Sequence, residues 1–143
     1  MLVDQISIFV ENKSGRLCDI TGVLSENGVD IRALSMADTT NFGILRLIVN
    51  NPEKAETALR EAGFTLSRTK VIAVCLPDVP GGMHGALRAL HDTGISVEYA
   101  YAFITHSREA AFVILRVEDN DRAIETLKKN GIKLMNASEV YSL

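Results

Sequence analysis

Two loops carry the residues whose types and spacing suit the binding of a small ligand. The first, residues 11–16, reads ENKSGR, and the second, residues 77–82, reads PDVPGG. Each is predicted to lead from a strand into a helix, whose N-terminus offers unpaired N–H groups that suit a carboxylate. Asn12 and Asp78 could accept a hydrogen bond from an ammonium group. This combination favours a zwitterion, such as a free amino acid, as the ligand.

The same residues have a second, purely structural explanation. Gly15 and Gly81 would let a ligand approach the backbone closely, and Ser14 is predicted to cap the helix that follows it. Alternatively, Asn12 or Asp78 only shapes a turn and the glycine only relaxes it. The loops alone do not decide between ligand binding and turn formation.

The two loops belong to an internal repeat. At an offset of 66 residues, Ile6 matches Ile72 and Gly15 matches Gly81, and further along the chain the offset becomes 68. The two extra residues fall in a turn of the second copy, residues 105–109, where an insertion is tolerated because turns are exposed. The repeat indicates duplication, and it divides the chain of 143 residues into two small modules.

Each copy is predicted to have the element order β-α-β-β-α-β. The fold class is α+β: two ferredoxin-like βαββαβ modules, residues 1–69 and 70–143, with antiparallel sheets and helices on one face. The predicted elements of the first copy are strand 3–10, helix 15–27, strands 30–36 and 44–49, helix 52–62 and an extended segment from 64. The predicted elements of the second copy are strand 71–76, helix 82–93, strands 95–104 and 110–117, helix 120–130 and extended residues to 143.

The junction between the copies has two solutions. Residues 71–76 align both with the first strand of the second copy and with a tail strand, residues 139–143. One segment is not expected to be the last strand of one module and also the first strand of the next. Either residues 65–70 supply the fourth strand of the first module, or the tail strand crosses over to complete that sheet.

The bulk composition excludes several classes of protein. Hydrophobic residues make up 47% of the chain and charged residues 23%, so a packed core is expected and disorder is not. The formal net charge of −3 disfavours nucleic acid as a partner, because a nucleic-acid surface must neutralise phosphates. The apolar runs are only strand-sized and the N-terminus has no basic leader, so we expect no membrane association and a cytoplasmic location.

The cysteines and histidines give no sign of metal or redox chemistry. Cys18 and Cys75 are far apart in apolar patterns, so we expect buried, reduced thiols, and no CxxC pair is present. His84 and His91 are seven residues apart on one predicted helix, about 10 Å along its axis, which is too far to chelate one ion. His106 falls in the insertion turn. We therefore expect no metal and no cofactor.

Rival functions lack their usual residues. An RNA-recognition module shares the strand order, but it needs exposed aromatic residues on central strands and a basic charge balance. Tyr99 and Tyr101 are predicted to share one sheet face, where they either pack against a neighbouring module or close a pocket. No serine or cysteine has a histidine at motif spacing, so no catalytic residue is assigned. A small metabolic enzyme and a structural adaptor stay open as alternatives to a binding protein.

The repeated pattern resembles that of the ACT domain family, the small regulatory modules of amino-acid metabolism. The family pattern is D/N-x-P-G-x-L, then a helix, then G-I/V-N/D-I. Residues 12–17 read NKSGRL with GVDI at 28–31, and residues 78–83 read DVPGGM with GISV at 94–97. The resemblance covers essentially the whole chain as two tandem modules. It implies a regulatory protein that binds a small amino acid or a related metabolite.

The resemblance also implies where the ligand is bound. Asn12 and Asp30 match positions that contact amino-acid ligands in some family members, and Ser14 stands where the family usually has proline. In such proteins the ligand often lies between two modules placed side by side, with Leu17 and Met83 flanking the pocket. The predicted ligand-binding residues are Asn12, Ser14, Gly15, Arg16, Leu17, Asp30, Asp78, Gly81, Gly82, Met83 and Ser96. We expect a homodimer that acts on a partner protein.

Overall fold

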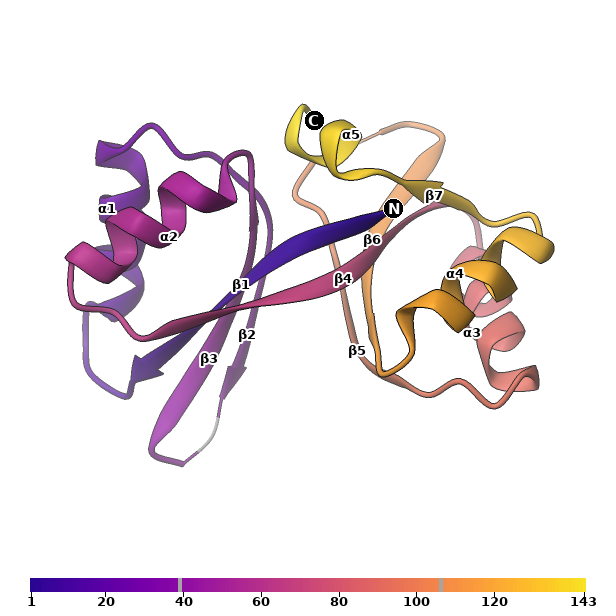
Figure 1. The fold of residues 1–143 in the computed structure, drawn as a ribbon, viewed down its shortest axis with the longest axis horizontal. Coiled ribbons are helices and arrows are strands. Elements are labelled where there is room, and N and C mark those ends of the chain that lie inside the picture. Colours follow the sequence, from indigo (N-terminus) through magenta and orange to yellow (C-terminus); the bar gives the residue numbers. More distant parts are fainter. Residues whose placement is uncertain (39, 106) are drawn as a thin grey trace. The chain divides into compact units, whose positions relative to one another are not determined.

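The computed structural model describes residues 1–38, 40–105 and 107–143, so His106 of the predicted insertion turn lies outside the described residues. The chain divides into two compact units. The N-terminal unit is Asp4–Thr69, and the C-terminal unit is Lys70–Leu143 together with Met1–Val3. The elements, labelled in Figure 1, are β1 (Leu2–Glu11), α1 (Arg16–Glu26), β2 (Ile31–Asp38), β3 (Phe42–Val49), α2 (Pro52–Glu61), β4 (Leu66–Pro77), α3 (Gly82–Asp92), β5 (Val97–Ala102), β6 (Ala110–Val117), α4 (Asn120–Lys129), β7 (Lys133–Met135) and α5 (Ala137–Tyr141).

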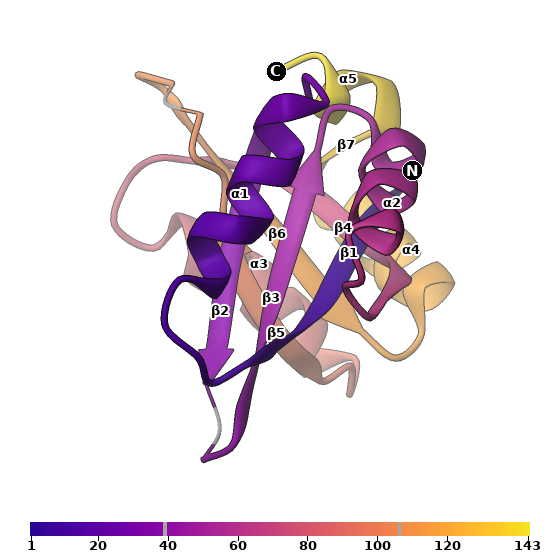
Figure 2. The ribbon, with the colours of Figure 1, turned by 90° about the vertical axis from the view of Figure 1, so that its left-hand side faces the viewer.

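The N-terminal unit is a sheet with two helices on one face. Its strands lie in the order β2-β3-β1-β4, and β3 pairs antiparallel with both of its neighbours. Helices α1 and α2 lie together in front of this sheet in Figure 2. Apolar side chains at alternate strand positions and at helical spacing meet between the two layers. This core contains Ile6, Ile8, Val10, Ile20, Leu24, Val29, Leu45, Leu47, Val49, Ala55, Leu59 and Leu66.

The C-terminal unit repeats this arrangement. Strand β6 pairs antiparallel with β5 and with β4, and the short β7 pairs antiparallel with the other edge of β4. Its core contains Ile72, Val74, Leu76, Ala86, Leu90, Ile95, Val113, Leu115, Val117, Ala123, Leu127 and Leu134. The predicted α+β class and the β-α-β-β-α-β order are therefore confirmed for both units.

The junction between the copies differs from both predicted solutions in one respect. Strand β4 is a single strand of 12 residues, Leu66–Pro77, and the boundary between the units falls inside it, after Thr69. The expectation that one segment cannot serve two modules is therefore wrong, because this strand is long enough to give its first four residues to one unit and the remainder to the next. Leu66 belongs to the core of the N-terminal unit, as expected if residues 65–70 supply its fourth strand.

The predicted tail strand is also wrong. Residues 137–141 form the short helix α5 in place of an extended segment at 139–143, and β7 pairs with Ala73–Cys75 of the C-terminal unit. A reciprocal cap stabilises the helix: the side chain of Asn136 accepts from the backbone N–H of Glu139, and the Glu139 carboxylate accepts from that of Asn136. Within residues 107–143, the tail adds no strand to the first sheet.

Arg68 ties the start of β4 to β1 and α2. Its Nη2 lies 2.7 Å from Asp4 Oδ2 and 3.1 Å from Glu53 Oε1, and its Nη1 lies 3.3 Å from Glu56 Oε2. These carboxylates, Asp4 first, raise the pKa of the Arg68 guanidinium above its ordinary value. Arg68 therefore pairs with three acidic side chains from two elements, one of which, Glu56, also pairs with Arg60 at 3.1 Å.

We expect Arg68→Met to lower the free energy of unfolding by about 1–3 kcal/mol, because the charge-assisted hydrogen bonds are lost and the three carboxylates then repel one another. Urea unfolding at neutral pH measures this change. Arg88→Met is the matched control, since Arg88 makes an exposed pair with Asp92 at 2.8 Å within α3, which contributes only about 0.5 kcal/mol or less. Equal losses in the two variants would contradict the special role of Arg68.

Candidate functional site

The first loop leads into α1 without a side chain that caps the N-terminus of the helix. Gly15 is the residue before α1, with φ of 86° in the left-handed region, and no side chain caps the helix there. The predicted cap at Ser14 is wrong, because the left-handed turn at Gly15 places Ser14 one residue too early in the chain. The first helical bond runs from the N–H of Asp19 to the carbonyl of Gly15. The amide groups at the start of α1 are therefore not satisfied by a capping side chain.

A cavity of about 230 Å³ lies beside this helix start. Its walls come from the end of β1, the loop, the start of α1, the end of β2 and the start of β3. The lining residues are Val10, Glu11, Asn12, Lys13, Gly15, Arg16, Leu17, Cys18, Met36, Asp38 and Gly43. Four predicted ligand-binding residues, Asn12, Gly15, Arg16 and Leu17, are thus brought together around one cavity. We call it the loop cavity.

The loop cavity has charges of both signs. Lys13 Nζ lies 2.9 Å from Glu11 Oε2, and Arg16 Nη2 lies 3.7 Å from the same oxygen. The hydrogen bond from Lys13 and then the two positive charges lower the pKa of Glu11 below its usual value. Asn12 donates from Nδ2 to the carbonyl of Thr40 at 3.3 Å, so its Oδ1 is the atom that could accept from a ligand. The lining of the loop cavity thus includes positive side chains that suit a carboxylate and negative side chains that suit an ammonium group.

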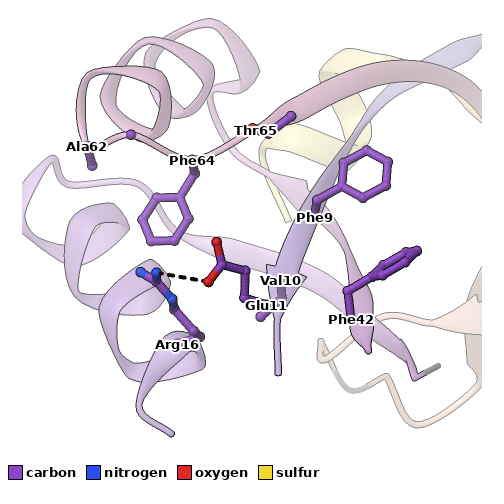
Figure 3. Close-up of a pocket in the computed structure, with 9 residues that line it drawn as sticks. Phe9, Val10, Glu11, Arg16, Phe42, Ala62, Phe64 and Thr65 are labelled. Atoms are coloured by element: carbon purple, nitrogen blue, oxygen red, sulfur yellow. Dashed lines mark ion pairs between the residues drawn. The ribbon is translucent and has the colours of Figure 1, made fainter. Parts of the chain in front are cut away.

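A second cavity, of about 150 Å³, adjoins the loop cavity (Figure 3). The two share Val10, Glu11 and Arg16. The other lining residues are Phe9, Phe42, Ala62, Gly63, Phe64 and Thr65. Figure 3 shows the Glu11 carboxylate directed toward the Arg16 guanidinium, which lies over the Phe64 ring at 5.8 Å from its centroid. We call this the aromatic cavity, and the sequence analysis missed it because its rings come from separate elements.

Asp30 is not part of either cavity. It follows the C-terminal end of α1, whereas the loop lies at the N-terminal end of that helix. Its backbone N–H donates to Asn50 Oδ1 at 2.9 Å, and its carboxylate pairs with Arg32 at 2.8 Å. The structure of the N-terminal unit therefore does not bring Asp30 to the loop cavity.

The second loop has the same backbone but tighter packing. Gly81 precedes α3 with φ of 89°, again without a capping side chain, and the N–H of Asp78 donates to the carbonyl of Glu109. A β-carbon on Gly82 would lie 2.2 Å from the carbonyl oxygen of Pro77, so only glycine fits there. Met83 is half-buried and packs against the core of the C-terminal unit.

Ser96 lies apart from the second loop. It lines a cavity of about 500 Å³ after the C-terminal end of α3, with acidic residues and one arginine around it. The lining residues are Gly94, Ile95, Ser96, Glu98, Glu118, Asp119 and Arg122. Like Asp30 in the first copy, Ser96 is therefore separated from its own loop by the length of a helix.

The cysteines and the tyrosine pair singled out in the sequence lie outside the two loops, residues 11–16 and 77–82. Both thiols are free, but Cys18 is exposed and Cys75 is half-buried, so the expectation that both are buried is wrong. Tyr99 and Tyr101 stack along β5 with ring centroids 6.5 Å apart.

Across residues 1–38, 40–105 and 107–143, no cluster of three or more potential ligands suits a metal ion. The same residues include no helix that is long and apolar enough to cross a bilayer.

Comparison with known proteins agrees with the whole architecture. The family described as ACT domain pair matches residues 1–143. Protein BT0572 from Bacteroides thetaiotaomicron is 39% identical, its crystal structure superposes with a TM-score of 0.94, and the match covers 100% of this chain and 98% of that one. Among curated proteins, no sequence matches this chain.

Regulatory subunits of aspartate kinase share the fold at low identity. The subunit from Thermus thermophilus, crystallised without ligand, is 16% identical with a TM-score of 0.64, and the match covers 89% of this chain and 91% of that one. The subunit from Thermus flavus is 15% identical with a TM-score of 0.61, over 90% and 92% of the two chains. These identities establish a common fold and no more.

We expect Lys13→Met to raise the pKa of Glu11 toward 4.5, because the main group that favours the ionised carboxylate is removed. Titration of the Glu11 carboxyl by NMR measures the change. The interaction favours the native state above the unfolded pKa of this group, and the advantage is lost as the pH falls through the lower native pKa.

Lys129→Met is the matched control for this titration. Lys129 pairs with Glu125 at 2.8 Å and lowers the pKa of that carboxyl in the same way. This variant should raise the pKa of Glu125 and leave that of Glu11 unchanged. An unchanged Glu11 pKa in Lys13→Met would contradict the arrangement of charges in the loop cavity.

Proposed function

The chain belongs to the ACT domain pair family, and on this premise we propose that it is a regulatory protein that binds a small amino acid in the loop cavity. ACT domains form a regulatory fold of amino-acid-binding proteins. The observation that carries the proposal is the helix start behind Gly15, which has no capping side chain and opens on a cavity of about 230 Å³. In this proposal the chain performs no catalysis of its own.

The charges of the loop cavity support a zwitterion. The α-carboxylate of the ligand would accept hydrogen bonds from the first amide groups of α1, where the helix dipole adds a favourable field, and Lys13 would add a positive charge. The α-ammonium group would donate to Asn12 Oδ1, with Glu11 and Asp38 as nearby negative charges. Each charged end of the ligand then meets a group of opposite character.

Asp30 and Ser96 enter this proposal only through a second module. Within its own unit, neither residue lies beside the loop of its own copy. If Asp30 contacts a ligand, as the family pattern implies, the contact must come from a module placed beside the loop of another. The second loop contains Asp78, Gly81 and Gly82. Thermal melting of variants at these residues, with and without ligand, decides whether this loop binds the same ligand.

A homodimer formed along β2 fits this requirement. Strand β2 stands at one end of the strand order, so its outer edge offers backbone groups for pairing. Leu34 and Met36 on this strand are 45% and 41% exposed, and Leu17 at the start of α1 is 47% exposed. Leu17 and Met36 also line the loop cavity, so a partner chain at this edge would lie next to the ligand.

Regulation would follow from differential binding. A ligand that prefers the associated state of the chain shifts the population toward that state. A partner protein that recognises only one of the two states would then respond to the concentration of the amino acid. We place this activity in the cytoplasm, where free amino acids and metabolic enzymes meet.

We expect at least one of the twenty amino acids to raise the melting temperature, by roughly 5–10 °C at about 100 times its dissociation constant. Gly15→Val should remove most of this increase, because the added side chain projects into open space at the cavity wall and strains a φ of 86°. Asn12→Ala should reduce it, because the acceptor for the ammonium group is lost. Thermal melting with and without ligand measures both effects.

Gly131→Val is the matched control for backbone strain. Gly131 has φ of 72°, and a β-carbon there also meets no atom within 4 Å. This variant should lose stability without ligand and keep the full increase with ligand. An unchanged increase in both Gly15→Val and Asn12→Ala would move the site away from the loop cavity.

We expect Leu34→Lys to convert the protein from dimer to monomer at micromolar concentration, because it places a desolvated charge in the apolar contact at the β2 edge. Sedimentation velocity measures the mass. Ile104→Lys is the control, since Ile104 is 60% exposed and belongs to the C-terminal unit, and it should stay dimeric. A wild-type protein that sediments as a monomer would exclude the β2 interface.

A further inference from the structure

We propose that the bound amino acid carries an aromatic side chain, and that its ring occupies the aromatic cavity. This inference rests on the proposed function, because it requires the ligand backbone to lie in the loop cavity. It adds the class of ligand, which neither the fold nor the family determines.

The size of the aromatic cavity matches a six-membered ring. Its volume is about 150 Å³, and an apolar protein cavity of about this volume is known to hold benzene. A serine or alanine side chain would leave most of this space to water. The volume therefore gives room for a ligand with a large planar side chain.

The walls of the cavity are rich in aromatic rings. Phe9 and Phe42 are neighbours at 6.1 Å between centroids, with planes inclined by 51°, and Phe64 lies across the cavity from them in Figure 3. Phe9 and Phe42 are 48% and 43% exposed. A ligand ring placed beside Phe9 and Phe42 would remove apolar surface from water on both partners and form aromatic pairs with them.

The charged groups at the wall are already paired with each other. Arg16 lies over the Phe64 ring at 5.8 Å from its centroid, and its Nη2 lies 3.7 Å from Glu11 Oε2. A charged ligand side chain would meet one like and one opposite charge and would compete with this pair, whereas a neutral aromatic side chain does not compete with it.

The two cavities are close enough for one ligand. They share Val10, Glu11 and Arg16, so a ligand held at the start of α1 needs only to extend past these residues. The ion pairs of Arg16 are long, 3.7 Å to Glu11 and 3.9 Å to Asp19. Such partly exposed pairs are weak, so the main cost of moving Arg16 aside is its contact with the Phe64 ring.

Calorimetric titration of the full chain tests the proposal with four probes: L-phenylalanine, L-leucine, L-serine and 3-phenylpropanoate, which lacks the ammonium group. We expect L-phenylalanine to bind at least about tenfold more tightly than L-leucine or L-serine, because only its ring can form aromatic pairs with phenylalanines of the cavity wall. We expect 3-phenylpropanoate to bind more weakly than L-phenylalanine by a similar factor.

Two variants locate the ring. Phe64 is half-buried on the core of the N-terminal unit, so Phe64→Leu keeps its apolar packing while it removes the aromatic face. Phe42→Ala acts on an exposed ring and spares the core. Each should weaken L-phenylalanine binding by about three- to tenfold and leave any binding of L-serine unchanged. Phe112→Leu, a half-buried position in the C-terminal unit, is the control and should change neither.

The outcomes separate this inference from the proposed function. If L-serine or L-leucine binds as tightly as L-phenylalanine, and Gly15→Val abolishes that binding, the aromatic class is overturned and the loop site stands. If 3-phenylpropanoate binds as tightly as L-phenylalanine, the zwitterion is overturned and the aromatic cavity stands. If no probe and no other amino acid binds, both proposals fail. If Phe112→Leu weakens L-phenylalanine binding as much as Phe64→Leu and Phe42→Ala do, the ligand ring does not occupy the aromatic cavity.

Discussion

The left-handed backbone at Gly15 determines what the first loop can do. Because the chain turns there with φ of 86°, it enters α1 without a side chain over the first amide groups. Those N–H groups must be satisfied by water or by a ligand. Any residue other than glycine would be strained at this position, so local stability and ligand access depend on the same residue.

Duplication kept this backbone and changed the groups around it. Gly81 repeats the turn with φ of 89°, but the counterpart of Arg16 is Gly82, whose β-carbon position is occupied by the carbonyl of Pro77. The second loop thus has no guanidinium and no space for one. Two copies with one backbone can therefore differ in the ligand that they accept.

Much of the fold could be predicted from local patterns. Alternating apolar residues such as Ile6, Ile8 and Val10 place one strand face in the core, and this periodicity identifies the strands without tertiary information. The tail was harder, because its short helix depends on the pair Asn136 and Glu139. Their three-residue spacing is the capping-box signal that could have identified the helix.

The site could be predicted only where its residues are close in sequence. Asn12, Gly15 and Arg16 meet because they share one loop. Asp30 follows in the same motif, yet an 11-residue helix separates it from the loop, a distance of about 16 Å at the rise of an α-helix. The contact of Arg16 with Phe64 depends on how α2 packs against the rest of the unit. Local sequence patterns do not predict this packing.

Strand β4 contributes side chains to the cores of both units. Leu66, before the unit boundary, and Ile72 and Val74, after it, all occupy even positions of one uninterrupted strand, so they share its alternation. A single residue inserted after Thr69 would change the parity between Leu66 and Ile72, so one alternating pattern would no longer describe the inward residues of both units.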